Sequence, residues 1–220
     1  MTCSAAVFVK TPGLSPLKTR LAAGIGTDAA TAWYRLAARA TAAALAAVPG
    51  MTAYWAVAEP GDAGAREWRD LPLLEQGPGS LGARMGRVHK ALVARHGSAF
   101  LLGADTPQLD PRVLCRAVDW LARPEPRLVM GPATDGGFWL LGANRALPGE
   151  TWIAAPCGHP DTAAGFRAAM DDLGEWLELP TLTDVDVAGD LAPMLAELSA
   201  LARPLPEQRV LADASIAHIG

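Results

Sequence analysis

The chain has 220 residues, a formal net charge of −4, 50% hydrophobic residues and 19% charged residues. This composition is typical of a globular chain with a substantial core, and it excludes an intrinsically disordered protein. A net negative charge gives no general attraction to nucleic acid or to an anionic membrane surface. Any anion-binding site must therefore be local.

The cysteines and the apolar tracts indicate a cellular setting. Cys3, Cys115 and Cys157 are widely spaced and match no metal-knuckle or redox-pair spacing, which favours reduced thiols in a cytoplasm. The first residues lack the basic and long apolar segments of a signal peptide. The alanine-rich tract 37–48 contains Arg39 and is too short to span a bilayer. We therefore expect a cytoplasmic protein without a membrane span.

Apolar runs that fit buried strands alternate along the chain with stretches rich in helix-forming residues. The expected strands are 5–9, 52–58, 71–76, 99–102, 127–130, 138–141 and 176–179. The expected helices are 28–48, 63–69, 80–96, 111–122, 161–173 and 189–201. Asp28, Ser80 and Asp110 are the expected N-caps, Pro111 follows Asp110 at the first helical position, and 203–220 has no assignment.

This alternation predicts crossover connections between strands. We expect a single α/β domain over residues 1–220, with a mainly parallel twisted sheet and helices on both faces. In open sheets of this kind, ligands bind at the carboxyl ends of the strands. The stretches that follow the expected strands are therefore the first places to search for chemistry.

The loop after the first expected strand gathers positive charge beside flexible backbone. Lys10, Lys18 and Arg20 lie in the stretch KTPGLSPLKTR, which also contains Gly13 and Thr19. Such a loop can offer cations and amide donors to a polyphosphate, although a solvated basic loop would have the same sequence. Neither a Walker P-loop nor a G-x-G-x-x-G fingerprint occurs in the chain.

Asp105 follows the apolar run 99–102 after a glycine and an alanine, and Pro107 prevents continued strand pairing at its own position. A carboxylate at this point lies where an open α/β sheet binds its ligand. The alternative is that Asp105 only caps the next turn or helix. The position of Asp105 at a strand end makes it a candidate metal ligand.

A late cluster of aspartates could complete such a site. The stretch TDVDVAGD contains Asp184, Asp186 and Asp190, any of which could face Asp105. Magnesium takes one or two protein carboxylates and fills its other positions with phosphate oxygens and water. Because aspartate also caps helices, we expect one residue of the three to be a cap. We favour Asp186 as the second ligand of Mg²⁺ or Mn²⁺.

Two glycine-rich stretches could contact a substrate. Asp135, Gly136 and Gly137 let the backbone approach a ligand closely, or they form a simple hairpin turn. The stretch GPGSLGARM, with Gly82 and Arg84, approaches a helix N-terminus and could hold a base or a ribose. It could also be only a loop and a cap.

Five stretches in order resemble a known family: VFVKTPGLSPLKTRLA, SLGARM, LLGADTPQL, GPATDGGFWLLG and DVDVAGDL. They look like a bacterial family of GT-A-type transferases that are described as glycosyltransferase-like. That family is distantly similar to 2-phospho-L-lactate guanylyltransferase and to the molybdenum-cofactor guanylyltransferases. The resemblance covers roughly residues 5–191 and implies a nucleotide-diphospho-sugar transferase fold, which is Rossmann-like.

The resemblance also implies roles for individual residues. Lys10, Lys18 and Arg20 would hold nucleotide phosphates, and Asp105 and Asp186 would bind magnesium. The implied activity is magnesium-dependent transfer from a nucleoside triphosphate or a nucleotide sugar to a small acceptor. The Asp135 carboxylate and the glycines after it would orient that acceptor.

The sequence departs from the family pattern in two places. Relatives usually read Asp-Thr-Pro where Val187 and Ala188 follow Asp186 here. Relatives also commonly carry a serine or threonine directly after the tryptophan that corresponds to Trp152, whereas Ile153 follows it here. The segment Cys157–Pro160 is unusual as well. These departures motivate an alternative, a catalytically degenerate protein that binds a nucleotide or a partner on the same scaffold.

Overall fold

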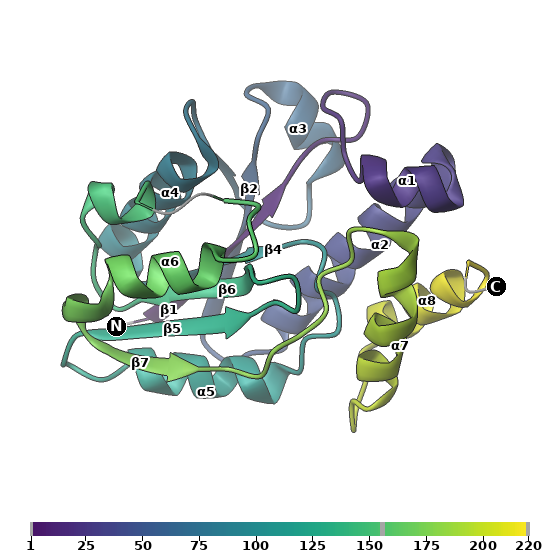
Figure 1. The fold of residues 1–220 in the computed structure, drawn as a ribbon. Coiled ribbons are helices and arrows are strands. Elements are labelled where there is room, and N and C mark those ends of the chain that lie inside the picture. Colours follow the sequence, from purple (N-terminus) through teal and green to yellow (C-terminus); the bar gives the residue numbers. More distant parts are fainter. Residues whose placement is uncertain (1, 155–156, 219–220) are drawn as a thin grey trace.

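The computed structural model describes residues 2–154 and 157–218, and its seven strands form one sheet (Figure 1). The strands are β1 (Thr2–Val9), β2 (Met51–Val57), β3 (Leu73–Glu75), β4 (Gly97–Gly103), β5 (Arg127–Pro132), β6 (Phe138–Ala143) and β7 (Glu175–Glu178). Their order across the sheet is β3-β2-β1-β4-β6-β5-β7. Only β6 runs antiparallel to its neighbours among the described strands. The predicted α/β class and mainly parallel sheet are confirmed.

Helices connect the strands and continue after the last one. They are α1 (Thr19–Ile25), α2 (Thr27–Ala46), α3 (Asp62–Glu67), α4 (Leu81–His96), α5 (Pro111–Leu121), α6 (Thr162–Ala169), α7 (Leu191–Ser199) and α8 (Pro206–Ile216). Short 3-10 helices cover Gly149–Trp152, Asp171–Leu173 and Ala188–Asp190. Ser80 and Asp110 accept hydrogen bonds from the first turns of α4 and α5, so both predicted caps are confirmed.

Two local predictions near the N-terminus were wrong. The basic loop was expected to continue through Leu21, but α1 begins at Thr19. Asp28 was expected to cap α2, but that helix begins at Thr27 and Asp28 lies inside its first turn. The reason is Gly26, whose φ of 88° lets the chain end one helix and start the next within a single residue. A junction this short leaves no room for a capping residue after it.

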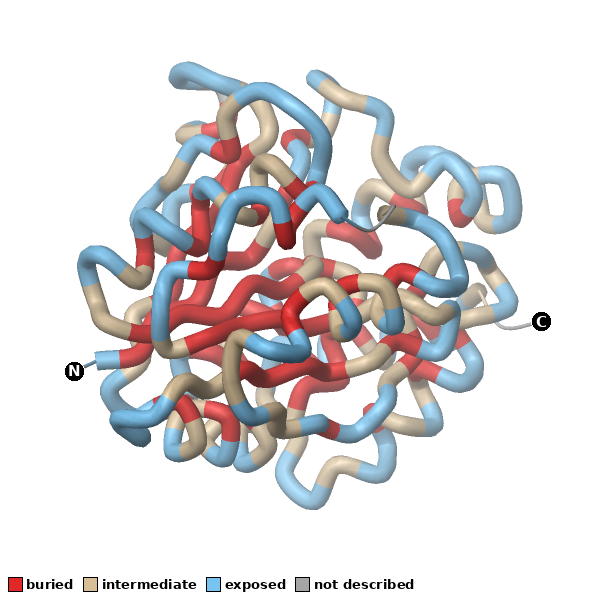
Figure 2. Tube along the Cα trace, turned by 60° about the vertical axis from the view of Figure 1, so that its left-hand side comes forward, coloured by how far each residue is buried: buried red, intermediate tan, exposed pale blue. Residues whose placement is uncertain are grey.

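Alternate side chains of the strands enter two cores, one on each face of the sheet. From β1, Val7 and Val9 pack with residues of α2, α5, α7 and α8, whereas Ala6 packs with residues of α4 and α6. This period of two is that of an extended chain. Figure 2 shows the buried strands at the centre, enclosed by more exposed segments. The predicted placement of helices on both faces is confirmed.

Helix α8, in the segment that had no sequence assignment, supports the sheet edge where Asp105 lies. The Trp33 indole N–H donates to Ser215 Oγ at 3.0 Å, which joins α8 to α2. The buried Gln208 amide donates to the carbonyl oxygens of Pro107 and Leu109 at 3.0 and 2.9 Å. The C-terminal helix therefore fixes the turn that follows Asp105. No helix among the described residues is long and apolar enough to cross a membrane.

His89 lies fully buried in the core under α4, with its ring 5.2 Å from that of Trp152. Neither ring nitrogen has a partner of hydrogen-bonding geometry among the described residues. Burial, which outweighs the nearby backbone of Ala99 and Ala143, lowers the pKa of His89 from 6.5 to about 4. The ring is therefore neutral in the folded protein at physiological pH.

His89 should make the fold sensitive to acid. The unfolded chain takes up a proton near pH 6.5 and the folded chain only near pH 4, so stability falls as the pH drops through that window. The expected loss is roughly 3 kcal/mol, measured by urea unfolding at several pH values. His89→Leu should remove this part of the pH dependence, whereas His218→Leu should not. An unchanged pH profile in His89→Leu would contradict the assignment.

Candidate active site

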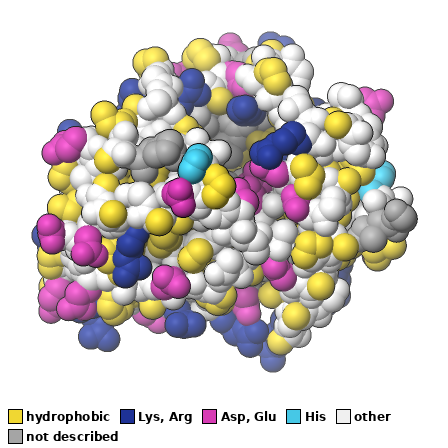
Figure 3. All heavy atoms as spheres, viewed as in Figure 1, with side chains coloured by type: hydrophobic (Ala, Val, Ile, Leu, Met, Phe, Trp, Pro, Cys, Tyr) yellow, Lys and Arg dark blue, Asp and Glu magenta, His cyan; other side chains and the backbone are white. Residues whose placement is uncertain are grey.

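The carboxyl ends of β1 and β4 border a cleft of about 650 Å³. Figure 3 shows it as a hollow with basic and acidic side chains along it and a histidine at its rim. The predicted site residues that line this cleft are Lys10, Lys18, Thr19, Arg20, Arg84, Asp105, Asp135, Gly137 and Asp186. Residues that lie up to 176 positions apart in the sequence are thus collected on one sheet edge.

Three of the predicted glycines do not line the cleft. Gly13 lies exposed in the first loop with a φ of 86°. A β-carbon at Gly82 would lie 1.9 Å from the carbonyl oxygen of Trp152, and one at Gly136 would lie 1.8 Å from that of Pro160. Gly82 and Gly136 therefore allow close packing of the cleft walls, and neither lines the cleft in which a ligand would bind.

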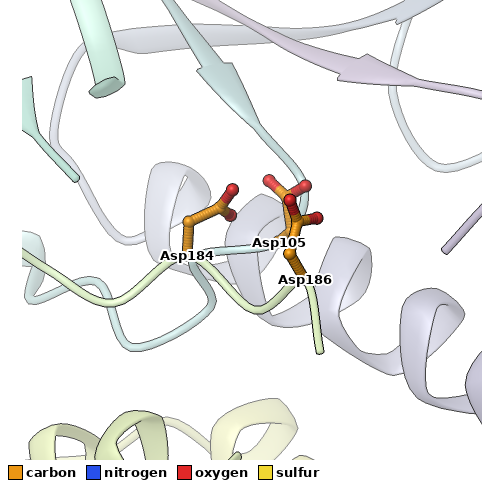
Figure 4. A group of neighbouring side chains, drawn as sticks. All are labelled: Asp105, Asp184 and Asp186. Carbon is orange, nitrogen blue, oxygen red and sulfur yellow. The ribbon is translucent and has the colours of Figure 1, made fainter. Parts of the chain in front are cut away.

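Three aspartates point toward one another at the floor of the cleft (Figure 4). Asp105 follows β4, and Asp184 and Asp186 lie on the extended segment after β7; one carboxylate oxygen of each lies within 4.8 Å of the others. Val185 N–H donates to the Asp105 carbonyl oxygen at 3.1 Å and so joins the two segments. Asp186 was the expected second ligand, whereas Asp184 was not favoured. The sequence did contain a sign of Asp184, because it lies two residues from Asp186, and this spacing puts both side chains on one face of an extended chain.

Lys18 lies between these carboxylates. Its ammonium donates to Asp105 Oδ2 at 2.7 Å, to Asp186 Oδ1 at 2.9 Å and to the Val185 carbonyl oxygen at 2.6 Å, and the side chain is only 7% exposed. Lys18 also has a φ of 44°, the one positive value for a non-glycine among the described residues. Such backbone strain is typical of functional positions, where the surrounding contacts hold a residue in an unfavourable conformation.

The carboxylates around Lys18 set the protonation of the site. Burial opposes the charged form of Lys18, but the three carboxylates outweigh burial and raise its pKa above the usual value. Burial raises the pKa of Asp105, but Lys18 outweighs it and the net pKa is lowered. Burial, followed by the charge of Asp105, raises the pKa of Asp184 to about 9. The three neighbouring carboxyl groups therefore need a proton or a cation to offset their negative charge.

Arg20 and Asp190 flank the cluster. The Arg20 guanidinium contacts Asp186 Oδ2, and most of the Arg20 side chain is exposed. Asp190 Oδ2 accepts the backbone N–H groups of Asp186 and Val187 at 2.8 Å each. Asp190 therefore stabilises the turn before α7, which is the capping role expected for one aspartate of this stretch.

Gln76, which follows β3, and Tyr34, on α2, also line the cleft, and neither was expected there from the sequence. The buried Gln76 amide donates to the carbonyl oxygens of Val9 and Ala56 at 3.3 and 2.9 Å, while its oxygen accepts from Arg84 at 3.4 Å. Tyr34 OH accepts the backbone N–H of Lys10 at 3.0 Å. These residues hold the first loop and Arg84 in place, and no local sequence pattern marks them.

The opposite wall comes from the hairpin between β5 and β6 and from the segment before α6. Gly137 N–H donates to Asp135 Oδ1 at 2.8 Å, and Ala133 N–H donates to the Gly137 carbonyl oxygen at 2.9 Å. Asp135 thus belongs to a hairpin turn and also lines the cleft. His159, which the sequence analysis gave no role, lines the cleft beside it. Ala155, in the segment that departs from the family pattern, lies outside the described residues.

The sequence profile of the family described as "Uncharacterized protein conserved in bacteria (DUF2064)" matches residues 23–158. The chain belongs to the DUF2064 family. The matched range includes Arg84, Asp105 and Asp135, whereas Lys18 and the late aspartates lie outside it. No curated protein matches the sequence at a significant level.

Solved structures share the fold of this DUF2064 chain. One is a protein from Desulfovibrio desulfuricans G20 that is assigned, without a demonstrated activity, to the nucleotide-diphospho-sugar transferases; it has a TM-score of 0.84 and 25% identity, over 100% of this chain and 97% of that one. A second is CMP:2-keto-3-deoxy-manno-octonic acid synthetase complexed with CTP, with a TM-score of 0.53 and 12% identity, over 90% and 99% of the two chains.

A third similar structure is Rv0371c from Mycobacterium tuberculosis H37Rv in complex with manganese, with a TM-score of 0.52 and 14% identity, over 89% and 98% of the two chains. The predicted nucleotide-diphospho-sugar transferase fold of the DUF2064 chain is therefore confirmed.

Proposed function

We propose that the protein is a metal-dependent transferase that uses a nucleotide donor, either a nucleoside triphosphate or a nucleotide sugar. One observation carries the proposal: three carboxylates converge with Lys18 and Arg20 at the carboxyl end of a central strand. Transfer from either donor expels a phosphate-bearing leaving group, so both reactions need concentrated positive charge at one point. The convergence supports a site of that kind.

The aspartates fit a divalent cation. Asp105, Asp184 and Asp186 offer only oxygen atoms, the ligands that Mg²⁺ and Mn²⁺ prefer, within 4.8 Å of one another. A bound cation of this class would neutralise charge that develops on phosphate oxygens. The cation would also replace the proton or the lysine contact that now offsets the negative charge of the carboxylates. The manganese complex of Rv0371c, which has a similar fold, supports a divalent cation at this site.

The protein's own residues would bind and orient the donor. Lys18 and Arg20 would hold phosphate oxygens. Their contacts with the carboxylates that would hold the cation support this role. Lys10 lies in the same loop and lines the same cleft. Arg84 and Gln76 line the wall beside β1, where they can contact the nucleoside.

A thermal-shift screen tests this function. Nucleoside triphosphates and nucleotide sugars would be added to the full chain with Mg²⁺, with Mn²⁺ or with a chelator. A ligand that binds only the folded state at about 100 times its Kd stabilises by about 2.7 kcal/mol and raises Tm by several degrees. We expect such a shift for at least one donor class, with metal only. A nucleotide that raises Tm equally with metal and with the chelator would contradict the metal assignment.

A further inference from the structure

The two ends of the cleft differ in charge. The basic residues that line the cleft are Lys10, Lys18, Arg20 and Arg84, all from the first part of the chain. The described lining residues from Leu101 onward include neither lysine nor arginine. At the end of the cleft that is formed by the β5–β6 hairpin and the segment before α6, the described lining residues therefore offer a ligand no lysine or arginine side chain.

This end of the cleft carries a carboxylate with a free oxygen. Asp135 Oδ1 accepts from Gly137 N–H at 2.8 Å, whereas Oδ2 has no partner among the described residues. Asp135 is exposed to the cleft, and Phe138 lies next to it with an apolar face. A free carboxylate oxygen accepts a hydrogen bond from a hydroxyl group and repels an anion.

His159 adds a donor to the same end. The backbone N–H of Asp161 donates to His159 Nδ1 at 3.2 Å, an arrangement that leaves Nε2 to carry a ring proton. Asp161 Oδ2 also lies 3.4 Å from Nδ1. Thr162 Oγ1 bonds both to the N–H and to the carbonyl oxygen of His159, at 3.0 and 2.6 Å. The histidine is therefore held by its own turn and presents an N–H donor at Nε2.

The two segments that carry these groups are locked together. Ala163 N–H donates to the Gly136 carbonyl oxygen at 2.9 Å, and Gly136 packs directly against the backbone of Pro160. The nearby Arg167 is directed elsewhere, because its guanidinium lies 3.6 Å from Glu178 and 4.8 Å from the centre of the Trp176 ring. The absence of lysine and arginine from the described lining at this end is thus a property of the fold.

We propose that the acceptor is an uncharged, hydroxyl-bearing molecule such as a sugar or a polyol, and that Asp135 is its base. This inference rests on the proposed function and narrows its acceptor class. A phosphate or carboxylate acceptor would have to bind beside Asp135 without a counter-charge, which costs free energy. A hydroxyl instead donates a hydrogen bond to Asp135 and accepts one from His159, and it needs a base where a phosphate does not.

The proposed step balances without a further reactant. The acceptor oxygen forms a bond to the donor's anomeric carbon or α-phosphorus, and the bond from that centre to the leaving phosphate oxygen breaks. The leaving nucleoside diphosphate or pyrophosphate keeps the electron pair of that bond. The hydroxyl proton passes to Asp135 Oδ2.

Matched acceptor pairs test the proposal. The full chain with Mn²⁺ and a donor identified by thermal shift would be given glycerol or glycerol 3-phosphate, and mannose or mannose 6-phosphate. Release of nucleoside diphosphate and of pyrophosphate would be followed. We expect at least one uncharged acceptor to accelerate release about tenfold or more over its phosphate ester. Preference for the esters, or no acceleration by an uncharged acceptor, would overturn the inference.

The role of Asp135 has its own control. Asp135→Asn should lower acceptor-dependent release about 100-fold, the scale of a lost general base, with the donor Kd unchanged. Asp172→Asn changes an exposed aspartate outside the cleft and should alter neither quantity. An unchanged rate in Asp135→Asn would overturn its assignment as base. Failure of every nucleotide to bind with metal would overturn the proposed function as well, whereas donor binding with ester preference would overturn only this inference.

Discussion

Lys18→Met should abolish turnover and destabilise the protein. Lys18 contacts two carboxylates at 2.7 and 2.9 Å with only 7% of its side chain exposed. Its loss leaves Asp105 without a counter-charge and Asp186 with the largely exposed Arg20 alone. Breaking a buried ion pair on one side costs roughly 3 kcal/mol. The substitution also removes a positive charge that would contact the leaving phosphates, and this loss should lower turnover by about 100- to 1,000-fold. Thermal unfolding and product release would measure the two effects separately.

A divalent cation gives this prediction a distinctive signature. In Lys18→Met a bound Mn²⁺ can take over the neutralisation of Asp105 and Asp186, so Mn²⁺ should raise the Tm of the variant more than that of the natural chain. Lys90→Met is a matched control, because Lys90 is exposed on α4 and lies outside the cleft. An equal Mn²⁺ response in all three proteins would count against the proposed placement of the cation.

Asp105→Asn should uncouple nucleotide binding from metal. Asparagine keeps the size of the side chain but removes the negative charge that both Lys18 and a divalent cation would contact. Metal affinity should fall at least 10- to 100-fold, the loss seen when even an indirect contact to a metal is removed. Turnover should fall at least 100-fold. Titration calorimetry of Mn²⁺ with and without the donor would measure the affinity.

The neighbouring aspartates make the Asp105 experiment specific. Asp184→Asn and Asp186→Asn should also weaken Mn²⁺ binding, because all three carboxylates converge. Asp213→Asn removes an exposed carboxylate on α8 and should change nothing. If Asp105→Asn binds the metal and nucleotide as tightly as the natural chain, Asp105 is not a ligand.

Local patterns were sufficient for most of the fold. Each expected strand formed, because a short apolar run between turn residues has few other ways to bury itself. Ser80 and Asp110 were recognisable as caps for a similarly local reason, since each bonds to N–H groups within three residues. Helix α1 and the start of α2 were missed because Gly26 joins them without the usual loop. Helix α8 depends on distant partners on α2 and after β4.

The sequence alone determined that Asp105 ends a buried strand and that a basic loop follows the first strand, because strand burial and loop composition are local properties. Only the tertiary structure decided which side chains meet. Lys18 reaches Asp105 across 87 positions and Asp186 across 168, and Asp184 joins them because its segment is bonded to the turn after β4. Contacts over such separations depend on how the elements pack, which residue spacing does not encode. The end of the cleft that carries Asp135 and His159 likewise exists only because the β5–β6 hairpin and the segment before α6 pack around Gly136.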